Sequence, residues 1–179
     1  MNRRLAQGFD GDATPVSHAP VVAVVALGAN LGDRAEALSS AVDALRALPL
    51  VDDVRAATPV ESVAVKPSGP DAAAPAYLNS VALVTTRLAP TVLLEYLHAI
   101  EARHGRERRE RWGDRTLDLD LIAYGELSSR TPVLTLPHPR AAERAFVLAP
   151  WLSLDPDAVL PGAGRVDVLL AALGEEEAP

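Results

Sequence analysis

Residues 116–122, TLDLDLI, place a leucine at every second position, and this alternation leaves the segment few ways to fold. In a β-strand, successive side chains point to opposite faces of the sheet. The three leucines therefore share one face, whereas Asp118 and Asp120 share the other with Ile122. At a rise of about 3.3 Å per residue, the Cα atoms of the two aspartates are roughly 6.5 Å apart. Both carboxylates can then converge on one or two cations.

Two interpretations of this acidic pair are open. The first is the solvated face of an ordinary amphipathic strand. The second is a binding site, because two carboxylates at this range repel each other unless a metal ion, an arginine or a shared proton neutralises them. Oxygen ligands without nearby cysteine favour Mg²⁺ over zinc.

An arginine cluster directly precedes the acidic pair, although the chain has a net charge of −7. Lys66 is the only lysine, and six of the arginines fall within residues 103–115. Guanidinium groups suit phosphate oxygens because they present a planar fork of donors. A solvated basic loop or a bias of composition is the alternative. Together with Asp118 and Asp120, the cluster favours a site for Mg²⁺-bound polyphosphate. The six are Arg103, Arg106, Arg108, Arg109, Arg111 and Arg115.

Composition limits the class of protein. The 179 residues, 49% of them hydrophobic and 23% charged, suit one globular domain. We expect a flexible N-terminal extension over 1–19, a single domain over 20–174 and a flexible tail over 175–179. The absence of cysteine excludes disulfides, thiolate zinc sites and a cysteine nucleophile. Without an apolar span or a signal peptide, a cytoplasmic location is expected.

Hydrophobic periodicity predicts an α+β fold. Strands are expected at 21–28 and 77–88, with a weaker candidate at 50–60, and a further strand at 116–125. One helix is expected after ANLGD at 29–33, in a pattern that Pro49 stops, and a second is expected from Pro90 to Gly105. The resulting order, β-α-β-β-α-β, is the ferredoxin-like arrangement, with helices on one face of a mainly antiparallel sheet.

Two further regions are less regular in pattern. The segment 64–76, AVKPSGPDAAAPA, is expected to lack regular structure because of its prolines and glycine, and to serve as a binding loop or lid, or else to be a tolerated insertion. Beyond residue 130 we expect a short strand, a proline-rich turn and one or two short helices.

Familiar phosphate-binding motifs are missing. The sequence contains neither a P-loop nor the protein-kinase motifs. The GANLGD turn at 28–33 has two glycines ahead of a helix, but a tight strand-to-helix turn explains it equally well.

Four blocks of sequence carry a specific resemblance. ALGANLGDR, YLNSVALV, IEARHGRERRERWGDRTLDLDLIAYG and LPHPRAAERAFVLAPW, spread over residues 21–160, resemble the 6-hydroxymethyl-7,8-dihydropterin pyrophosphokinases of folate biosynthesis. The resemblance implies the ferredoxin-like fold and the transfer of the terminal diphosphate of ATP to the hydroxymethyl group of a reduced pterin, with release of AMP.

The resemblance also implies the roles of the charged residues. Asp118 and Asp120 would coordinate two Mg²⁺ ions that hold the ATP phosphates, with Asp120 a candidate proton acceptor. Among the arginines, the assignment of the mobile phosphate contact stays open between Arg108, Arg109 and Arg111. The arginines implied to meet the phosphates are Arg106 and Arg115, with Arg109 as a further catalytic candidate and Arg108 and Arg111 as ATP-binding candidates.

The substrate pockets follow from the same resemblance. The pterin pocket would be formed by Tyr77, Asn79, Trp112 and Phe146, in keeping with aromatic faces for stacking and an amide for the ring edge. Residues facing ATP would be Leu121, Thr135, His138 and Arg144. Trp112 and Phe146 could instead be plain core residues, and His138 a structural histidine.

The chain also departs from the family pattern. The family loop that reads Tyr-x-Thr-x-Pro-x-Gly corresponds to ESVAVKP at 61–67, Pro139 replaces a common tyrosine, and Val133 replaces an arginine. A homologue that binds pterin or nucleotide with altered activity is therefore one alternative, and an RNA-binding module is another. We expect a monomer with ATP and a reduced pterin as substrates, binding neither nucleic acid nor a membrane.

Overall fold

The computed structural model describes residues 19–66, 69–71, 75–104 and 116–176. Its main elements alternate strands and helices in the order predicted from the sequence. These are β1 (Val21–Ala29), α1 (Arg34–Arg46), β2 (Val51–Ala56), β6 (Tyr77–Thr86), α2 (Pro90–Arg103), β7 (Asp118–Tyr124), α3 (Ala145–Leu154) and α4 (Val166–Glu176). The shorter elements are β3 (Val60–Ser62), β4 (Ala64–Lys66), β5 (Gly69–Asp71), β8 (Ser129–Arg130), β9 (Thr135–Leu136), the 3₁₀ turn η1 (Ala141–Glu143), β10 (Val159–Leu160) and β11 (Gly164–Arg165).

The central sheet has the strand order β2-β6-β1-β7, and every pairing in it is antiparallel. The short strand β3 also pairs with β6, beyond the end of β2. Reading β2, β6 and β7 as the second, third and fourth strands of the core gives the ferredoxin-like order predicted above, and the α+β prediction is confirmed. β7 lies at one edge of this sheet, and β1 is its neighbour.

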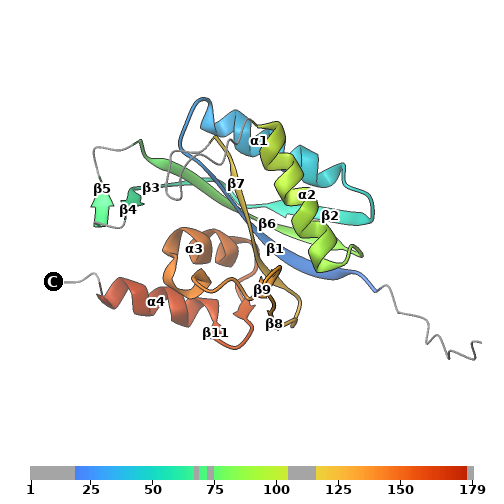
Figure 1. Cartoon of the computed structure of the whole chain (residues 1–179). Coiled ribbons are helices and arrows are strands. Elements are labelled where there is room, and N and C mark those ends of the chain that lie inside the picture. The colour runs from blue at the N-terminus through green and yellow to red at the C-terminus, as the bar shows by residue number, and fades with distance from the viewer. Residues whose placement is uncertain (1–18, 67–68, 72–74, 105–115, 177–179) are drawn as a thin grey trace, which may run out of the picture.

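Helices cover both faces of the sheet, as Figure 1 shows. α1 and α2 lie on one side, and α3 and α4 lie on the other. The two helices of the ferredoxin-like core thus lie on one face as predicted, and the C-terminal helices, for which no face was predicted, cover the other. The apolar residues of the second face, such as Val24, Val81 and Leu83, need their own cover, which the C-terminal helices supply.

Local signals in the sequence begin the two helices of the first layer. Asp33 caps α1, because its carboxylate accepts a hydrogen bond of 3.0 Å from the backbone N–H of Glu36. Pro90 occupies the first turn of α2, where its missing N–H leaves no helical bond unmade. Among the described residues, none of the helices combines the length and apolar character needed to cross a bilayer.

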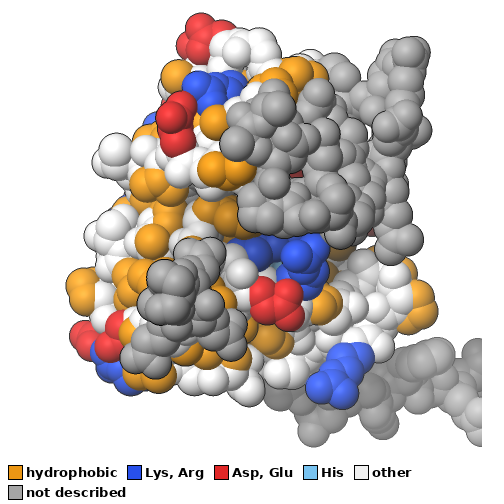
Figure 2. Space-filling model, turned by 90° about the vertical axis from the view of Figure 1, so that its left-hand side faces the viewer, with side chains coloured by type: hydrophobic (Ala, Val, Ile, Leu, Met, Phe, Trp, Pro, Cys, Tyr) orange, Lys and Arg blue, Asp and Glu red, His pale blue; other side chains and the backbone are white. Residues whose placement is uncertain are grey.

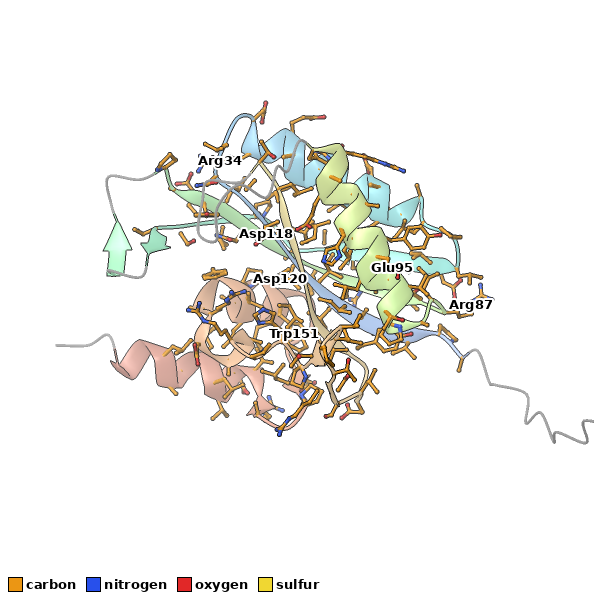
Figure 3. The ribbon with its side chains drawn as sticks, viewed as in Figure 1. Arg34, Arg87, Glu95, Asp118, Asp120 and Trp151 are labelled. Carbon is orange, nitrogen blue, oxygen red and sulfur yellow. The ribbon has the colours of Figure 1, made fainter. Side chains whose placement is uncertain are left out.

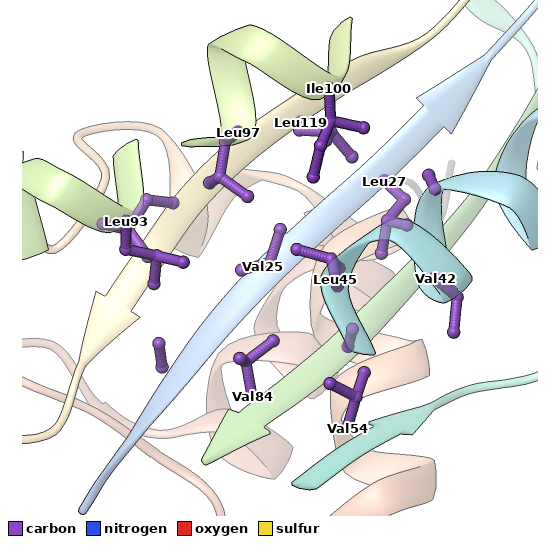
Figure 4. Packing of buried hydrophobic residues seen from close by; sticks show 14 of the residues in the cluster. Val25, Leu27, Val42, Leu45, Val54, Val84, Leu93, Leu97, Ile100 and Leu119 are labelled. Atoms are coloured by element: carbon purple, nitrogen blue, oxygen red, sulfur yellow. The ribbon is translucent and has the colours of Figure 1, made fainter. Parts of the chain in front are cut away.

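The larger hydrophobic core lies between the sheet and the α1/α2 layer (Figure 4). Leu45 from α1 and Leu93 and Leu97 from α2 are fully buried against strand residues such as Val25 and Leu27. Burying one such leucine contributes roughly 1.5–3 kcal/mol. The strands are therefore fixed from the helical side, which leaves the opposite side of one sheet end available for polar groups.

The segment after β3 differs from its prediction. Regular structure was not expected between residues 64 and 76, yet β4 and β5 form a short antiparallel hairpin in which Ala64 pairs with Asp71 and Lys66 with Gly69. Pro70 is tolerated because this two-stranded hairpin has only edge strands, so that a missing N–H breaks no central ladder. The prediction of irregular structure over the whole segment was wrong.

Tyr124 provides a test of how β7 is tied to the start of α2. Its hydroxyl donates a 2.6 Å hydrogen bond to the carbonyl oxygen of Leu88, and burial raises the pKa of its phenol above the ordinary 10.0. The folded protein therefore holds this proton more tightly than the unfolded chain, and the stabilisation is lost as the pH rises through the folded pKa.

We expect Tyr124→Phe to lower the free energy of unfolding by about 1 kcal/mol at neutral pH. Because the variant lacks the titrating group, its stability should also fall less steeply above pH 10.0 than that of the parent protein. Urea unfolding across this pH range measures both effects, with Tyr96→Phe as the control in the same core. Identical alkaline profiles for Tyr124→Phe and the parent would contradict this account.

Candidate functional site

Three neighbouring strands form the floor of the candidate site. Gly28 on β1 lies opposite Asn79 of β6 on one side and opposite Asp118 of β7 on the other. Ala26 lies opposite Asp120 in the same way. These residues face the side of the sheet that α3 covers, since their neighbour in alternation, Ile122, belongs to the α3/α4 core. The predicted sharing of one face by Asp118, Asp120 and Ile122 is confirmed.

The two carboxylates lie one after the other along β7, on the stretch that passes above α3 (Figure 3). Both are half-buried, and the side chain of Asp120 retains 33% of its exposure. Small residues on β1 stand opposite both of them, so that no bulky side chain separates the carboxylates from the strands beside them. The pair is therefore fixed by the sheet and still reachable from solvent.

Two side chains from the segment before α3 approach Asp120. Arg144 donates from Nη1 to Asp120 Oδ2 at 2.9 Å, and His138 Nε2 lies 3.9 Å from the same oxygen. Arg144 is the residue immediately before α3, and the first turn of the helix bonds to its carbonyl oxygen. Acidic groups from β7 and basic groups from the segment before α3 thus meet at one point of the sheet.

His138 is held in one orientation. Its Nδ1 accepts a hydrogen bond of 3.2 Å from the backbone N–H of Arg140, so that in the neutral ring the proton is on Nε2, the atom toward Asp120. The pKa of His138 is lowered, mainly by burial and further by Arg144 and Arg140, while Asp120 and Asp118 raise it. The neutral ring therefore predominates at pH 7, and it offers a donor rather than a full charge.

A second part of the site lies toward β3. Asn79 is buried and donates from Nδ2 to Ser62 Oγ at 2.8 Å, which fixes the amide plane. Gly28 leaves room for this amide, because a Cβ on it would lie only 3.3 Å from Asn79 Oδ1 and 4.0 Å from Tyr77. Asn79 and Tyr77 thus lie beside Gly28, one strand away from Asp118.

Phe146 connects the charged part to the α3 layer. It is half-buried in the first turn of α3, and the guanidinium carbon of Arg144 lies 5.7 Å from the centre of its ring. This is the range of a cation–π contact, which orients both groups. Figure 2 shows the end of the molecule that carries β3, with basic and acidic side chains gathered near its centre beside hydrophobic ones.

The structure brings together seven of the residues predicted for the site. These are Tyr77, Asn79, Asp118, Asp120, His138, Arg144 and Phe146. Leu121 does not join them, because strand alternation turns its side chain into the core beneath α1 and α2. Thr135 is exposed on β9, where it pairs with Arg130. The predictions for Arg106, Arg108, Arg109, Arg111, Trp112 and Arg115 lie outside the described residues.

Sequence reasoning missed three residues around the site. Ser62 orients Asn79, and Arg34 ties β3 to the start of β6 by donating to Glu61 at 2.9 Å and to the carbonyl oxygen of Ala76 at 2.7 Å. Glu101, buried on α2, accepts a bond from the backbone of β7. Of these three residues, only Glu101 could have been noticed in the sequence. It is an acidic residue at a position that the apolar stripe of α2 assigns to the buried face, four residues after Leu97.

Comparisons with known proteins show which family this chain is similar to. A model of the family 7,8-dihydro-6-hydroxymethylpterin-pyrophosphokinase (HPPK) matches residues 24–156. The chain is 43% identical over 148 residues to the 2-amino-4-hydroxy-6-hydroxymethyldihydropteridine pyrophosphokinase of Pseudomonas aeruginosa, covering 83% of this chain and 89% of that protein. The enzyme of the same name from Haemophilus influenzae is 36% identical, over 88% of this chain and 96% of its own length.

Solved structures share the fold. The crystal structure of wild-type Plasmodium falciparum HPPK-DHPS superposes with a TM-score of 0.63 at 11% sequence identity. The match covers 88% of this chain and 46% of the Plasmodium chain, so that this chain spans about half the length of that protein. At such low identity the likeness speaks for the fold alone.

The charged groups around His138 predict that its pKa shifts in opposite directions in two variants. In protein freed of divalent metal, NMR titration of the ring protons should give a midpoint below 6.5. Asp120→Asn should lower this pKa further, because it removes the carboxylate that favours the charged ring, and Arg144→Gln should raise it. A shift of either variant in the other direction would contradict the arrangement.

Proposed function

Because the chain belongs to the 7,8-dihydro-6-hydroxymethylpterin-pyrophosphokinase family, we propose that Asp118 and Asp120 hold the Mg²⁺ of its Mg-ATP substrate. The enzyme transfers a pyrophosphoryl group from ATP to hydroxymethyldihydropterin in folate biosynthesis, as a 2-amino-4-hydroxy-6-hydroxymethyldihydropteridine diphosphokinase. The observation that carries the assignment is the placement of both carboxylates on one face of β7, beside Arg144 and His138. The RNA-binding alternative finds no support in any of these findings.

The donor set fits magnesium. The described residues contain no group of three or more His, Cys, Asp and Glu side chains gathered as a metal cage. Mg²⁺ in nucleotide sites does not require one, since it commonly takes one or two carboxylates and completes its shell with phosphate oxygens and water. The two carboxylates would hold two ions, which neutralise phosphate charge and polarise the attacking hydroxyl.

Cationic side chains suit the other phosphate oxygens. Arg144 is held beside the carboxylate pair by its 2.9 Å hydrogen bond to Asp120 and by its contact with Phe146. Its guanidinium group is therefore already oriented and would need little rearrangement to contact a bound triphosphate. His138 would add a neutral N–H donor from Nε2. Contacts from Arg106, Arg109 and Arg115 with the phosphates, and from Arg108 and Arg111 with ATP, stay predictions.

The part of the site toward β3 suits the pterin. Asn79, fixed by Ser62, offers an amide edge to the ring, and Tyr77 and Phe146 offer aromatic faces. Trp112 stays a prediction for this pocket. A pterin held between these groups would lie beside Asp118, because Gly28 separates Asn79 from Asp118 by a single strand.

The reaction then needs little covalent help from the protein. The pterin hydroxyl oxygen bonds to the β-phosphorus of ATP, the bond from that phosphorus to the AMP oxygen breaks, and AMP leaves. The hydroxyl proton departs to a base, for which Asp120 is our candidate. Holding both reactants in line supplies much of the acceleration in reactions of this kind.

One chain is proposed to suffice for this activity. The monomeric state and the cytoplasmic location stay predictions.

Replacing either carboxylate tests the metal assignment. We expect Asp118→Asn and Asp120→Asn each to lower kcat about 10²–10³-fold, the scale of a lost electrostatic contact to the transition state, with little change in stability. The exposed carboxylate of Asp53 on β2 gives a matched control, Asp53→Asn, which should retain full turnover. Near-normal turnover of either site variant at saturating Mg²⁺ would overturn the assignment.

The products distinguish the activity from that of an ordinary kinase. Incubation with ATP, Mg²⁺ and the reduced hydroxymethylpterin should yield AMP and a pterin diphosphate in equal amounts. Chromatography of the reaction mixture identifies and quantifies both products. ADP and a pterin monophosphate would show transfer of one phosphoryl group instead. Pterin binding without nucleotide turnover would point to a homologue of altered activity.

The pterin pocket has its own test. Phe146→Leu retains an apolar side chain but removes a stacking face, and we expect it to raise the KM for the pterin about tenfold, the equivalent of roughly 1.4 kcal/mol. Leu152→Ala, on the same helix and packed against the α3/α4 core, is the control for damage to the helix. An unchanged pterin KM in Phe146→Leu would remove this residue from the pocket.

A further inference from the structure

Glu101 is the only acidic residue among the described ones whose side chain is fully buried. It retains 2% of its exposure and lies on the face of α2 that packs on the sheet, next to Ile100 and one turn beyond Leu97. A carboxylate in such surroundings is unfavourable unless it is hydrogen-bonded. An apolar side chain at this position would pack on the sheet as its neighbours do, so the acid calls for a specific reason.

The reason lies in the partner of the carboxylate. Glu101 Oε1 accepts a hydrogen bond of 2.8 Å from the backbone N–H of Leu119. β7 is an edge strand, and along its outer side no neighbouring strand of the described sheet pairs with it. The carboxyl group thus takes the place that a strand carbonyl would occupy.

The position of this bond within β7 is what connects it to the site. The N–H of Leu119 belongs to the peptide group that joins Asp118 to Leu119, and Asp120 follows directly. Fixing the plane of that peptide constrains the backbone torsions on both sides of it. The directions of the two site carboxylates therefore depend on the acceptor that Glu101 supplies.

A second contact ties the same end of α2 to the start of β7. Thr116 Oγ1 donates to the carbonyl oxygen of His104 at 2.6 Å. His104 lies three residues after Glu101, and Thr116 lies two residues before Asp118. The last turn of α2 thus holds the strand at two points that flank the first site carboxylate. Leu117, fully buried between these points, anchors the strand on the core side.

We propose that Glu101 is a positioning residue that sets the spacing and direction of Asp118 and Asp120 toward Mg-ATP. The proposal rests on the proposed function of those two carboxylates. Glu101 acts through the backbone of β7, in the way that groups outside a metal site commonly orient its ligands.

Three variants and one control separate positioning from general stability. Glu101→Leu removes the acceptor, Glu101→Asp withdraws it by one methylene, and Glu101→Gln retains an acceptor oxygen of the same reach. Leu93→Ala, in the same helix and fully buried but remote in sequence from Glu101, lowers stability without touching β7 at Leu119. Should Glu101→Leu fail to fold, Glu101→Asp carries the test.

Two measurements are made on each variant. The first is amide hydrogen exchange of Leu119 in metal-free protein, which requires no activity. The second is the Mg²⁺ concentration for half-maximal turnover at saturating substrates, together with the KM for the pterin. We expect Glu101→Leu and Glu101→Asp to exchange the Leu119 amide faster and to raise the half-saturating Mg²⁺ about tenfold, with the pterin KM unchanged. Glu101→Gln should recover part of both losses, and Leu93→Ala should show neither.

Faster exchange at Leu119 with an unchanged Mg²⁺ requirement would overturn the proposal, and so would an equal rise in Leu93→Ala. These outcomes are separable from failure of the proposed function. If the proposed function were wrong, Asp118→Asn and Asp120→Asn would themselves leave the Mg²⁺ requirement unchanged, whatever the exchange rate of the Leu119 amide.

Discussion

The antiparallel pairing of β7 with β1 is the constraint on which the site depends. Its register sets Asp118 opposite Gly28 and Asp120 opposite Ala26, so that the two carboxylates stand over the smallest side chains of the sheet. The leucines that alternate with the acids lie in the core beneath α1 and α2, and a slip of one residue would exchange the two sets. Burial of the leucines therefore holds the acids on the face toward α3.

The C-terminal helices complete what this face begins. α3 follows a segment that brings Arg144 and His138 to Asp120, and Phe146 follows in its first turn. α3 and α4 bury their own apolar side chains against the second face of the sheet. Arg144, His138 and Phe146 are therefore supported by a packed helical layer. The same layer that stabilises the fold thus supplies the cationic and aromatic wall of the site.

Much of the fold and of the placement of the site residues was predictable from the sequence, because the periodicity of hydrophobic residues indicates which face of a strand or helix is buried. The alternation in β7 and the spacing in α1 and α2 gave the correct faces, and the family resemblance supplied residues that the structure brings together. What escaped depends on contacts distant in sequence. The β4–β5 hairpin was missed because prolines disfavour central strands but not edges. The expectation that Leu121 faces ATP stays a prediction, although strand alternation turns its side chain into the core. Ser62 and Arg34 carry no local signal, since their partners come from other elements.

Whether Asp118 and Asp120 together hold the metal of the bound nucleotide can be measured by locating a paramagnetic ion in the protein. Mn²⁺ accepts the same oxygen ligands as Mg²⁺ and broadens nearby amide resonances when added with a non-hydrolysable ATP analogue. We expect the amide resonances of Gly28, Asp118 and Asp120 to broaden first. Broadening centred instead on the exposed acidic residues Asp157 and Asp167, beside Arg165, would contradict this expectation.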